Sequence, residues 1–444
     1  MSIATPFARR VAGVFATRVA RFLIGFATSF LLAGLLLPAG RGQYALLVLV
    51  PGMLNALGQL GLPTAMSFFA GRGVRLDRLQ RLGWLLTAVL SLVLVGGAIL
   101  LLPWISATFL RTVPSELVLV SLASLPFQFA TAFAGSTLIG RQRFRNYNLI
   151  VVGQSAAMLV GVVVLVGLLD LGVAGAIASY VGVAILAGVA TAVELNRVVR
   201  EEPADGPSVK LPQLLSYGIR IYPASVTGYF SYRVDVLVLS ALLADPAAVG
   251  LYTFAVSLAE LAFIVPDSVS TVFYPRVAGM DRKDADALAP QVSRFTLLVT
   301  AIGVLALVPA AYLATHIVLP AYRDSIWPFL VLIPGVIGLS VSKVLAGYIN
   351  GLGLPLMVAR ASIANLVINV VANLVFIPLL GIVGAALASL VSYVSHAAIL
   401  TFIASRLAHR RPLEYVVPTR AEVRRLVDGV REILGRLARP RRTA

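Results

Sequence analysis

The chain has 444 residues, of which 59% are hydrophobic and 12% charged, and its mean hydropathy is +0.93. Soluble domains carry roughly a quarter charged residues, so this composition excludes a soluble globular protein. The absence of cysteine excludes disulfides and thiol chemistry, and the net charge of +17 comes from loops and a basic tail rather than from a nucleic-acid-binding surface.

Apolar runs of about 20 residues, the length that a helix needs to cross ~30 Å of hydrocarbon, recur along the chain. We predict twelve spans, at 15–37, 44–66, 83–104, 116–139, 148–169, 172–193, 217–243, 249–274, 295–318, 326–350, 359–379 and 382–404. Outer-membrane barrels have short alternating segments instead. The predicted fold class is therefore an all-α polytopic membrane protein with twelve transmembrane helices.

The second half of the chain repeats the first at an offset of about 209 residues. Three matches follow in the same order, namely 42–45 with 250–253, 138–140 with 349–351, and 172–179 with 381–388. Six spans precede the polar stretch 194–214 and six follow it, so the halves have the same topology. We predict two six-helix bundles related by a parallel internal repeat, a common plan among secondary transporters.

Four regions follow from this organisation. We predict an N-terminal six-helix bundle (1–193), a cytoplasmic linker (194–214), a C-terminal six-helix bundle (215–404) and a basic tail (405–444). In the tail, apolar residues at helical spacing alternate with arginines, which favours an amphipathic helix on the anionic cytoplasmic leaflet. A solvated basic tail without fixed structure is the alternative.

Basic residues mark every second loop. The basic side is formed by Arg9, Arg10, Arg72, Arg75, Arg78, Arg81, Arg141, Arg143, Arg145, Arg197, Arg200, Lys210, Arg276, Arg282 and Lys283. The opposite loops carry only Arg41, Arg111 and Arg323. Short basic loops stay in the cytoplasm, so we expect both termini to be cytoplasmic.

Charged residues inside the predicted spans are costly and need a reason. Arg233 precedes the turn near Ala247 by 14 residues and Glu260 follows it by 13, so at 1.5 Å per residue they lie at similar depth and could pair. Asp235 and Asp267 accompany them. We regard Asp235, Glu260 and Asp267 as candidates for ion coupling or for structural ion pairs, and the sequence does not decide between the two.

The candidate substrate-binding cations are Arg233, Lys343, Arg220 and Arg21. Arg21 and Arg220 lie near predicted cytoplasmic ends, where snorkelling to headgroups is the alternative. A cationic cavity suits an anionic substrate such as a pyrophosphate. Interhelical hydrogen bonding explains the stripe of Asn365, Asn369 and Asn373 at least as well as sugar binding does. We find no nucleotide loop, metal cluster or nucleophile motif, so we expect no enzyme, catalytic residue, metal or cofactor.

Several segments resemble a known group of membrane proteins. They are 36–44, 233–240, 245–252, 350–355 and 377–386. In order and spacing they look like blocks of the oligosaccharide (O-antigen type) flippases, within the multidrug/oligosaccharidyl-lipid/polysaccharide flippase superfamily. Lipid II flippases of that superfamily usually carry two further spans, which argues against a peptidoglycan precursor as substrate.

The resemblance implies a flippase of the cytoplasmic membrane that turns a polyprenyl-pyrophosphate-linked oligosaccharide to the outer leaflet by alternating access, for polysaccharide biosynthesis. The implied partners are the lipid-linked glycan, membrane lipids, and a polysaccharide polymerase or glycosyltransferases, with no nucleic acid. A cation-coupled multidrug-type exporter is the alternative, and a non-transporting scaffold of an assembly complex is a third hypothesis.

Overall fold

The computed structural model describes residues 4–202 and 206–424, and all regular structure in these residues is helical. Within a bilayer a helix satisfies every backbone polar group internally, which favours this architecture for such apolar segments. The elements are α1 (Ala4–Gly58), α2 (Leu62–Gly71), α3 (Leu76–Leu100), α4 (Leu102–Thr108), α5 (Ser115–Leu122), α6 (Leu125–Gly140), α7 (Phe144–Gly161), η1 (Val162–Leu168), α8 (Gly172–Glu201), α9 (Leu211–Ser231), α10 (Val234–Leu243), α11 (Pro246–Glu260), η2 (Leu261–Phe263), α12 (Ile264–Ala278), α13 (Arg282–Leu313), η3 (Ala314–Val318), η4 (Pro320–Ser325), α14 (Ile326–Gly351), α15 (Pro355–Ala408) and η5 (Pro412–Tyr415).

Among the described residues, nine helices are long and apolar enough to cross a membrane, or ten if α9 and α10, which meet at a 45° bend, form one span. Two of these helices are longer than one crossing of the membrane requires, since the apolar part of α1 has 39 residues and α15 has 54. Both are interrupted by a non-helical residue, Leu37 (φ 57°) in α1 and Gly381 (φ 57°) in α15. Each interruption lies where the sequence predicts one span to end and the next to begin.

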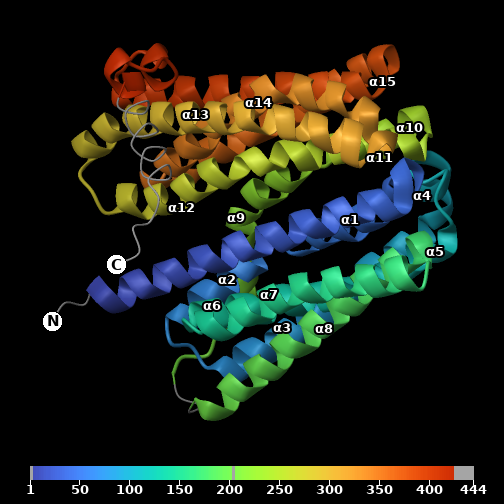
Figure 1. The fold of residues 1–444 in the computed structure, drawn as a ribbon. Helices are drawn as coiled ribbons and strands as arrows, with labels where there is room; N and C mark the ends of the chain where they lie inside the picture. The colour runs from blue at the N-terminus through green and yellow to red at the C-terminus, as the bar shows by residue number, and fades with distance from the viewer. Residues whose placement is uncertain (1–3, 203–205, 425–444) are drawn as a thin grey trace, which may run out of the picture.

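The helices gather in two groups with α1 between them (Figure 1). α2 to α8 form one group and α10 to α15 the other, while α9 contacts both α2 and α15. α1 packs along α11 in the second group and against α7 and α8 in the first. The groups lie closest where α4, α10 and α11 lie and diverge toward the end at which α1 begins. α1 thus links the two groups.

The closest backbone contact between α1 and α11 is reciprocal. A Cβ atom on Gly42 would lie 1.8 Å from the carbonyl oxygen of Pro246, and a Cβ atom on Gly250 would lie 1.8 Å from that of Pro38. Gly250 follows Gly42, and Pro246 follows Pro38, by the same 208 residues of the internal repeat. Glycine is required at both positions because any side chain would separate the helices.

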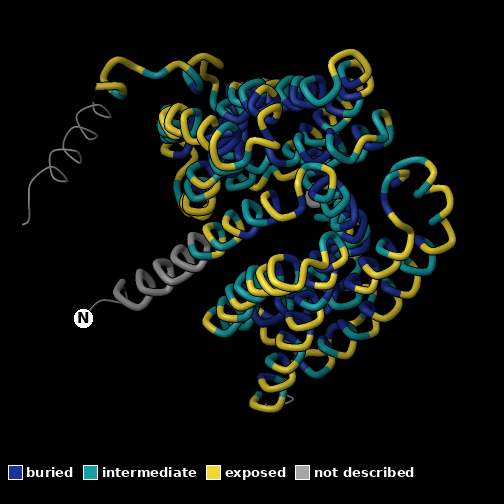
Figure 2. Tube along the Cα trace, turned by 45° about the vertical axis from the view of Figure 1, so that its right-hand side comes forward, coloured by how far each residue is buried: buried dark blue, intermediate teal, exposed yellow. Residues whose placement is uncertain are grey.

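Apolar side chains cover the outside of the structure as well as its core. Figure 2 shows exposed residues along the outward surfaces of both groups and buried residues between their helices. Leu100 and Leu92 are 82% and 77% exposed, and Leu305 and Leu379 are also exposed. A soluble protein rarely shows so much exposed apolar surface. These outward faces therefore have the composition expected of lipid-facing helices.

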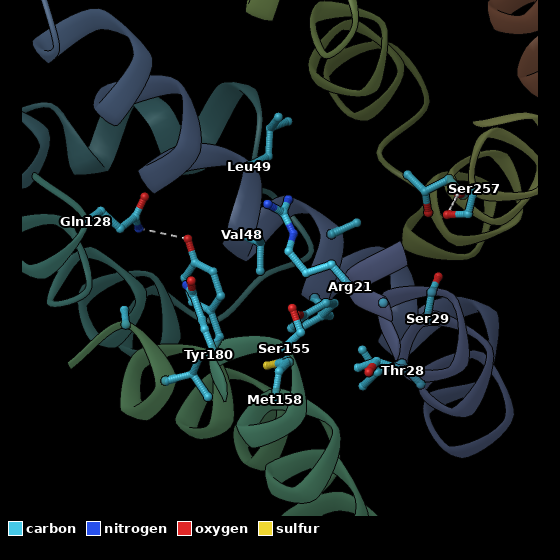
Figure 3. Close-up of a pocket in the computed structure, with 18 of the residues that line it drawn as sticks. Arg21, Thr28, Ser29, Val48, Leu49, Gln128, Ser155, Met158, Tyr180 and Ser257 are labelled. Carbon is cyan, nitrogen blue, oxygen red and sulfur yellow. Dashed lines mark hydrogen bonds between the residues drawn. The ribbon is translucent and has the colours of Figure 1, made fainter. Parts of the chain in front are cut away.

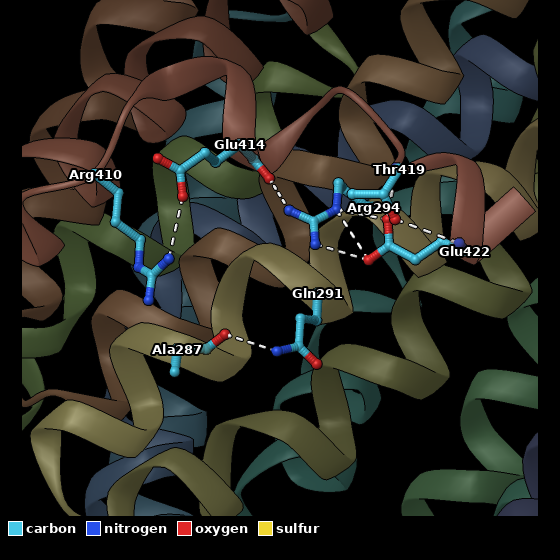
Figure 4. Close-up of polar contacts among 7 residues, drawn as sticks. All are labelled: Ala287, Gln291, Arg294, Arg410, Glu414, Thr419 and Glu422. Carbon is cyan, nitrogen blue, oxygen red and sulfur yellow. Dashed lines mark hydrogen bonds and ion pairs between the residues drawn. The ribbon is translucent and has the colours of Figure 1, made fainter.

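The start of the predicted tail is fixed to α13 (Figure 4). Arg294 pairs with Glu422, with Nη2 donating to Oε1 at 2.7 Å and Nε donating to Oε2 at 2.8 Å and to Oε1 at 3.1 Å. The backbone N–H of Thr419 donates to Glu422 Oε2 at 2.8 Å, and the backbone N–H of Glu422 donates to Thr419 Oγ1 at 3.3 Å. This reciprocal capping box begins a helix at Arg420. Most of the predicted amphipathic helix lies in residues 425–444, outside the described residues.

The Arg294–Glu422 ion pair gives this attachment a defined pH dependence. Hydrogen bonding from Arg294 lowers the pKa of Glu422 from 4.5 to about 2. Because the folded pKa is below the unfolded one, the pair contributes its full stability above about pH 4.5 and loses it as the pH falls toward 2. We expect Glu422→Gln to speed amide hydrogen exchange in residues 412–424 at pH 7, while the wild-type chain keeps its protection at pH 5 after correction for intrinsic exchange.

Glu414→Gln is the matched control for this measurement. Glu414 pairs with Arg410 at 3.1 Å, and both side chains are more than a third exposed, so this pair contributes little. Equal protection in Glu422→Gln and the wild-type chain would show that the tail is held by other contacts.

Candidate functional site

A cavity of about 710 Å³, cavity 1, lies where α1 faces α6, α7 and α8, beside the α9–α10 link and α11. Its lining comprises Arg21, Gly25, Thr28, Ser29, Leu32, Arg41, Tyr44, Ala45, Val48, Leu49, Gln128, Thr131, Tyr147, Val151, Gln154, Ser155, Met158, Tyr180, Val183, Ala184, Tyr229, Arg233, Val236, Thr253 and Ser257. Both groups of helices therefore contribute to its wall. Cavity 1 thus lies between the two groups of helices.

The charge in the lining of cavity 1 is entirely positive. Arg21, Arg41 and Arg233 line it, and none of the described residues in the lining is an aspartate or glutamate. Figure 3 shows the Arg21 side chain in the middle of this lining, between Ser29 and Tyr180. Guanidinium groups bind phosphate and carboxylate oxygens through paired hydrogen bonds. The cavity thus favours an anion.

Neutral hydrogen-bonding groups occupy the wall opposite α1. The amide Nε2 of Gln128 donates to Tyr180 Oη at 2.9 Å (Figure 3). It also donates to Ser124 Oγ, behind the lining, at 2.8 Å. Gln154 and Ser155 of α7 add further donors and acceptors to the lining. Amide and hydroxyl groups beside aromatic rings suit a ligand that carries hydroxyl groups, such as a sugar.

A second cavity of about 1300 Å³, cavity 2, lies on the other side of the first part of α1, against α11, α12 and α14. Its lining comprises Arg21, Phe22, Leu23, Gly25, Phe26, Ser29, Ile221, Ser257, Glu260, Leu261, Ile264, Asp267, Ser268, Ser270, Thr271, Tyr274, Ala346, Gly347, Asn350, Gly353, Pro355 and Val358. Arg21, Gly25, Ser29 and Ser257 line both cavities. The cavities are therefore adjacent, and only cavity 2 contains carboxylates.

Two ion pairs join residues that the sequence selected. Arg233 Nη2 lies 3.6 Å from Glu260 Oε1, which confirms the pairing predicted from their similar depth. Arg233 lines cavity 1 and Glu260 lines cavity 2, so this pair lies between them. Lys343 Nζ lies 2.5 Å from Asp267 Oδ1 and 4.4 Å from the ring centre of Phe263. Lys343 lines neither cavity, and its ammonium group is paired with Asp267.

Asp235 differs from the other carboxylates. It is buried, and it accepts hydrogen bonds from Tyr252 Oη, from the backbone N–H of Val236 at 2.8 Å and from Ser389 Oγ at 3.3 Å. It lines neither cavity. These neutral partners join α10, α11 and α15, which indicates a structural role for Asp235.

Other predicted polar residues also lie away from the cavities. Arg220 is exposed on α9 and lines neither cavity, which fits the alternative of snorkelling to the headgroups better than a place in the substrate site. The face of α9 at Gly218 packs on Leu60, and a residue two positions later points to the opposite side of a helix. In α15, Asn365 accepts a hydrogen bond from Ser392 Oγ at 2.9 Å, so this part of the asparagine stripe joins the two halves of that helix.

Arg41 is a charged residue of cavity 1 that was not among the candidates from the sequence. The prediction that Arg41 lies in an outer loop is wrong. Helix α1 resumes directly after Leu37, so Arg41 lies within the helix and its side chain reaches the first part of α1 at Ser29. The Arg41 side chain is 6% exposed and donates to the carbonyl oxygen of Ser29 at 2.5 Å. Pro38 before Arg41 signals a helix start, which was the available clue.

The arrangement of cavities between two helix groups can be compared with known proteins. A family model described as polysaccharide biosynthesis protein matches residues 8–280. The chain belongs to this family. Among curated proteins, no sequence matches this member of the polysaccharide biosynthesis protein family.

Solved structures share the fold of this polysaccharide biosynthesis protein. The lipid II flippase MurJ in an inward closed conformation is 16% identical, with a TM-score of 0.73 over 88% of this chain and 87% of its own. An outward-facing multidrug resistance MATE family transporter of the MOP superfamily is 17% identical, with a TM-score of 0.61 over 88% and 94%. A mutant of the Vibrio cholerae MATE transporter VcmN is 14% identical, with a TM-score of 0.59 over 93% and 99%. The predicted flippase-family resemblance is confirmed, and these neighbours are transporters or flippases rather than enzymes.

Proposed function

We propose that this protein flips a polyprenyl-pyrophosphate-linked oligosaccharide from the cytoplasmic to the outer leaflet of the cytoplasmic membrane by alternating access. The carrying observation is the lining of cavity 1, which has three arginines, no carboxylate and several amide and hydroxyl groups. Arginines suit the pyrophosphate, and the neutral polar wall suits the sugars. Membership of the polysaccharide biosynthesis protein family supports this substrate class.

The proposal includes the topology predicted from the sequence. It assigns twelve spans, because α1 and α15 each break once and α9 with α10 forms one bent span. With twelve spans, we infer the regions predicted from the sequence. They are the bundles 1–193 and 215–404 and the linker 194–214, with both termini in the cytoplasm. The polymerase or glycosyltransferases that the family resemblance implies would act on the same lipid-linked glycan.

The test is transport of a fluorescent polyprenyl-pyrophosphate oligosaccharide by the full chain in liposomes. We expect Arg233→Gln to reduce the initial flipping rate about 10-fold to 100-fold, since a hydrogen bond to a charged group contributes about 1.5–3 kcal/mol. Arg220→Gln is the control, because it removes the same charge from an exposed position of α9 that lines neither cavity.

The ion pair requires one further variant. Arg233→Gln leaves Glu260 without its partner, so a structural defect could mimic a binding defect. The double variant Arg233→Gln with Glu260→Gln removes both charges. If the double variant flips at the wild-type rate, Arg233 serves the ion pair and does not bind the anion. If the wild-type chain flips no polyprenyl-linked sugar, the proposed function is wrong.

Cavity 2 favours a second candidate, a cation-coupled exporter. Glu260 and Asp267 line it, and the MATE transporters share the fold. Both carboxylates are paired with cations, so an entering sodium ion or proton would have to displace Arg233 or Lys343. Dye efflux that follows a sodium or proton gradient and is lost in Asp267→Asn would favour this candidate. Flipping that is insensitive to both gradients would remove the coupling role of these carboxylates.

A further inference from the structure

Arg41 is a buried cation whose described partners are all neutral. Its Nη2 donates to Ser29 Oγ at 2.9 Å and to Ser257 Oγ at 3.0 Å, and its Nη1 donates to the Ser29 carbonyl oxygen. Its guanidinium lies 5.1 Å from the ring centre of Phe254. Its Nε is buried and has no hydrogen-bond partner among the described residues. None of the ion pairs in residues 4–202 and 206–424 includes Arg41.

The described surroundings of Arg41 contain no negative charge to balance its guanidinium group. Burying a cation without a counter-charge costs several kcal/mol in a low-dielectric interior, and a membrane protein keeps such residues mainly where they contact substrates or ions. Arg41 lines cavity 1, and the lining of that cavity supplies no carboxylate. An anion that enters cavity 1 beside Arg41 would therefore provide the missing charge.

Arg41 and Arg21 lie at different depths of the same cavity. The Arg41 guanidinium binds Ser29, which is eight residues beyond Arg21 on the same helix. At 1.5 Å per residue this places Arg41 about 12 Å further along α1 from the end at which the chain begins. An anion moving along α1 would thus meet Arg21 first and Arg41 later.

We propose that Arg41 is a second, deeper anion-binding station of cavity 1, which takes phosphate oxygens of a pyrophosphate ester after they leave Arg21. This inference rests on the proposed function, because the pyrophosphate is that of the lipid-linked substrate. Binding at Arg41 exchanges its neutral hydroxyl acceptors for phosphate oxygens. The bond between Arg41 and Ser257 joins α1 to α11, so the same exchange releases one contact between α1 and the second helix group.

The experiment measures binding of geranylgeranyl pyrophosphate to the full chain in nanodiscs, with inorganic pyrophosphate as a parallel probe. We expect Arg41→Gln to weaken binding about tenfold or more, as expected for a lost charged hydrogen bond, and Arg41→Lys to lie between Arg41→Gln and the wild type because it keeps the charge but loses the planar fork. Arg111→Gln is the control, since Arg111 is exposed, donates to the carbonyl oxygen of Ala107 and lines neither cavity.

Ser257→Ala gives a test that does not depend on removing the cation. It deletes one neutral acceptor that competes with the ligand for Nη2. We expect Ser257→Ala to tighten pyrophosphate binding several-fold. A purely structural Arg41 predicts unchanged or weaker binding, and this variant decides the matter if Arg41→Gln does not fold.

The outcomes separate the two proposals. If the wild-type chain binds the prenyl pyrophosphate and Arg41→Gln binds it equally well, the deeper station is wrong and the proposed function stands. If the wild-type chain binds no prenyl pyrophosphate, the deeper station is wrong, whereas the proposed function is decided by flipping of the polyprenyl-linked oligosaccharide in liposomes. If inorganic pyrophosphate binds with the same affinity and the same dependence on Arg41, the station recognises the anion itself and gains nothing from the lipid.

Discussion

Gly42→Ala is expected to destabilise the protein by about 3 kcal/mol or more and to abolish transport, because a buried backbone cannot move aside without separating α1 from α11. The added Cβ atom would lie 1.8 Å from the carbonyl oxygen of Pro246 and 2.9 Å from the backbone nitrogen of Gly250. Both obstacles are main-chain atoms rather than flexible side chains. Gly250→Ala should destabilise the protein and abolish transport to the same extent, since its Cβ would lie 1.8 Å from the carbonyl oxygen of Pro38.

The measurement is the thermal unfolding midpoint of the purified protein, together with the flipping rate in liposomes. Gly96→Ala is the matched control, because Gly96 is also helical and an added Cβ there meets no atom within 4 Å. This control should be neutral or slightly stabilising, as alanine is the better helix former. Equal midpoints for Gly42→Ala and Gly96→Ala would show that the crossing of α1 and α11 is looser than described.

Asp235→Leu is expected to destabilise the protein by about 2–4 kcal/mol. The substitution leaves the hydroxyl groups of Tyr252 and Ser389 without the carboxylate that accepts from them, at a buried junction of α10, α11 and α15. Asp235→Asn should cost less, because its amide oxygen still accepts a hydrogen bond. The unfolding midpoint in detergent is the measurement.

Asp245→Ala is the comparison for this prediction. Asp245 accepts from the backbone N–H of Ala247 at 2.8 Å and caps α11 at an exposed position, so its loss should cost about 1 kcal/mol. A variant Asp235→Leu that unfolds like the wild type, but no longer responds to an ion gradient, would reverse the structural assignment of Asp235 and make it the coupling group.

Sequence reasoning located the Arg233–Glu260 pair because depth along two consecutive helices depends only on residue counts from their shared turn. It could not separate Asp235 from Glu260, although both are deep carboxylates. The difference lies in Ser389 of α15, which follows Asp235 by 154 residues and supplies one of its hydrogen bonds. Which distant helix faces a residue is set by tertiary packing rather than by local pattern.

The error at Arg41 has a different physical origin. Hydropathy divides the chain into apolar runs and assigns the polar residues between them to loops. In α1 the chain reverses with one non-helical residue, Leu37, and helix resumes at Pro38. Arg41 therefore points back along α1 toward Ser29 instead of out to water. A turn this short leaves no loop for the hydropathy argument to place the charge in.

The reciprocal contact of Gly42 with Pro246 and of Gly250 with Pro38 has the form of a homodimer interface at its two-fold axis, where a surface meets its own copy. Two separate single-bundle chains that paired through this surface would have needed only a linker to become the present molecule. Substitutions on the axis act on both halves at once, which holds the halves alike there. Positions off the axis, such as Gly25 and its repeat counterpart Arg233, carry no such constraint, and there the two halves differ in charge.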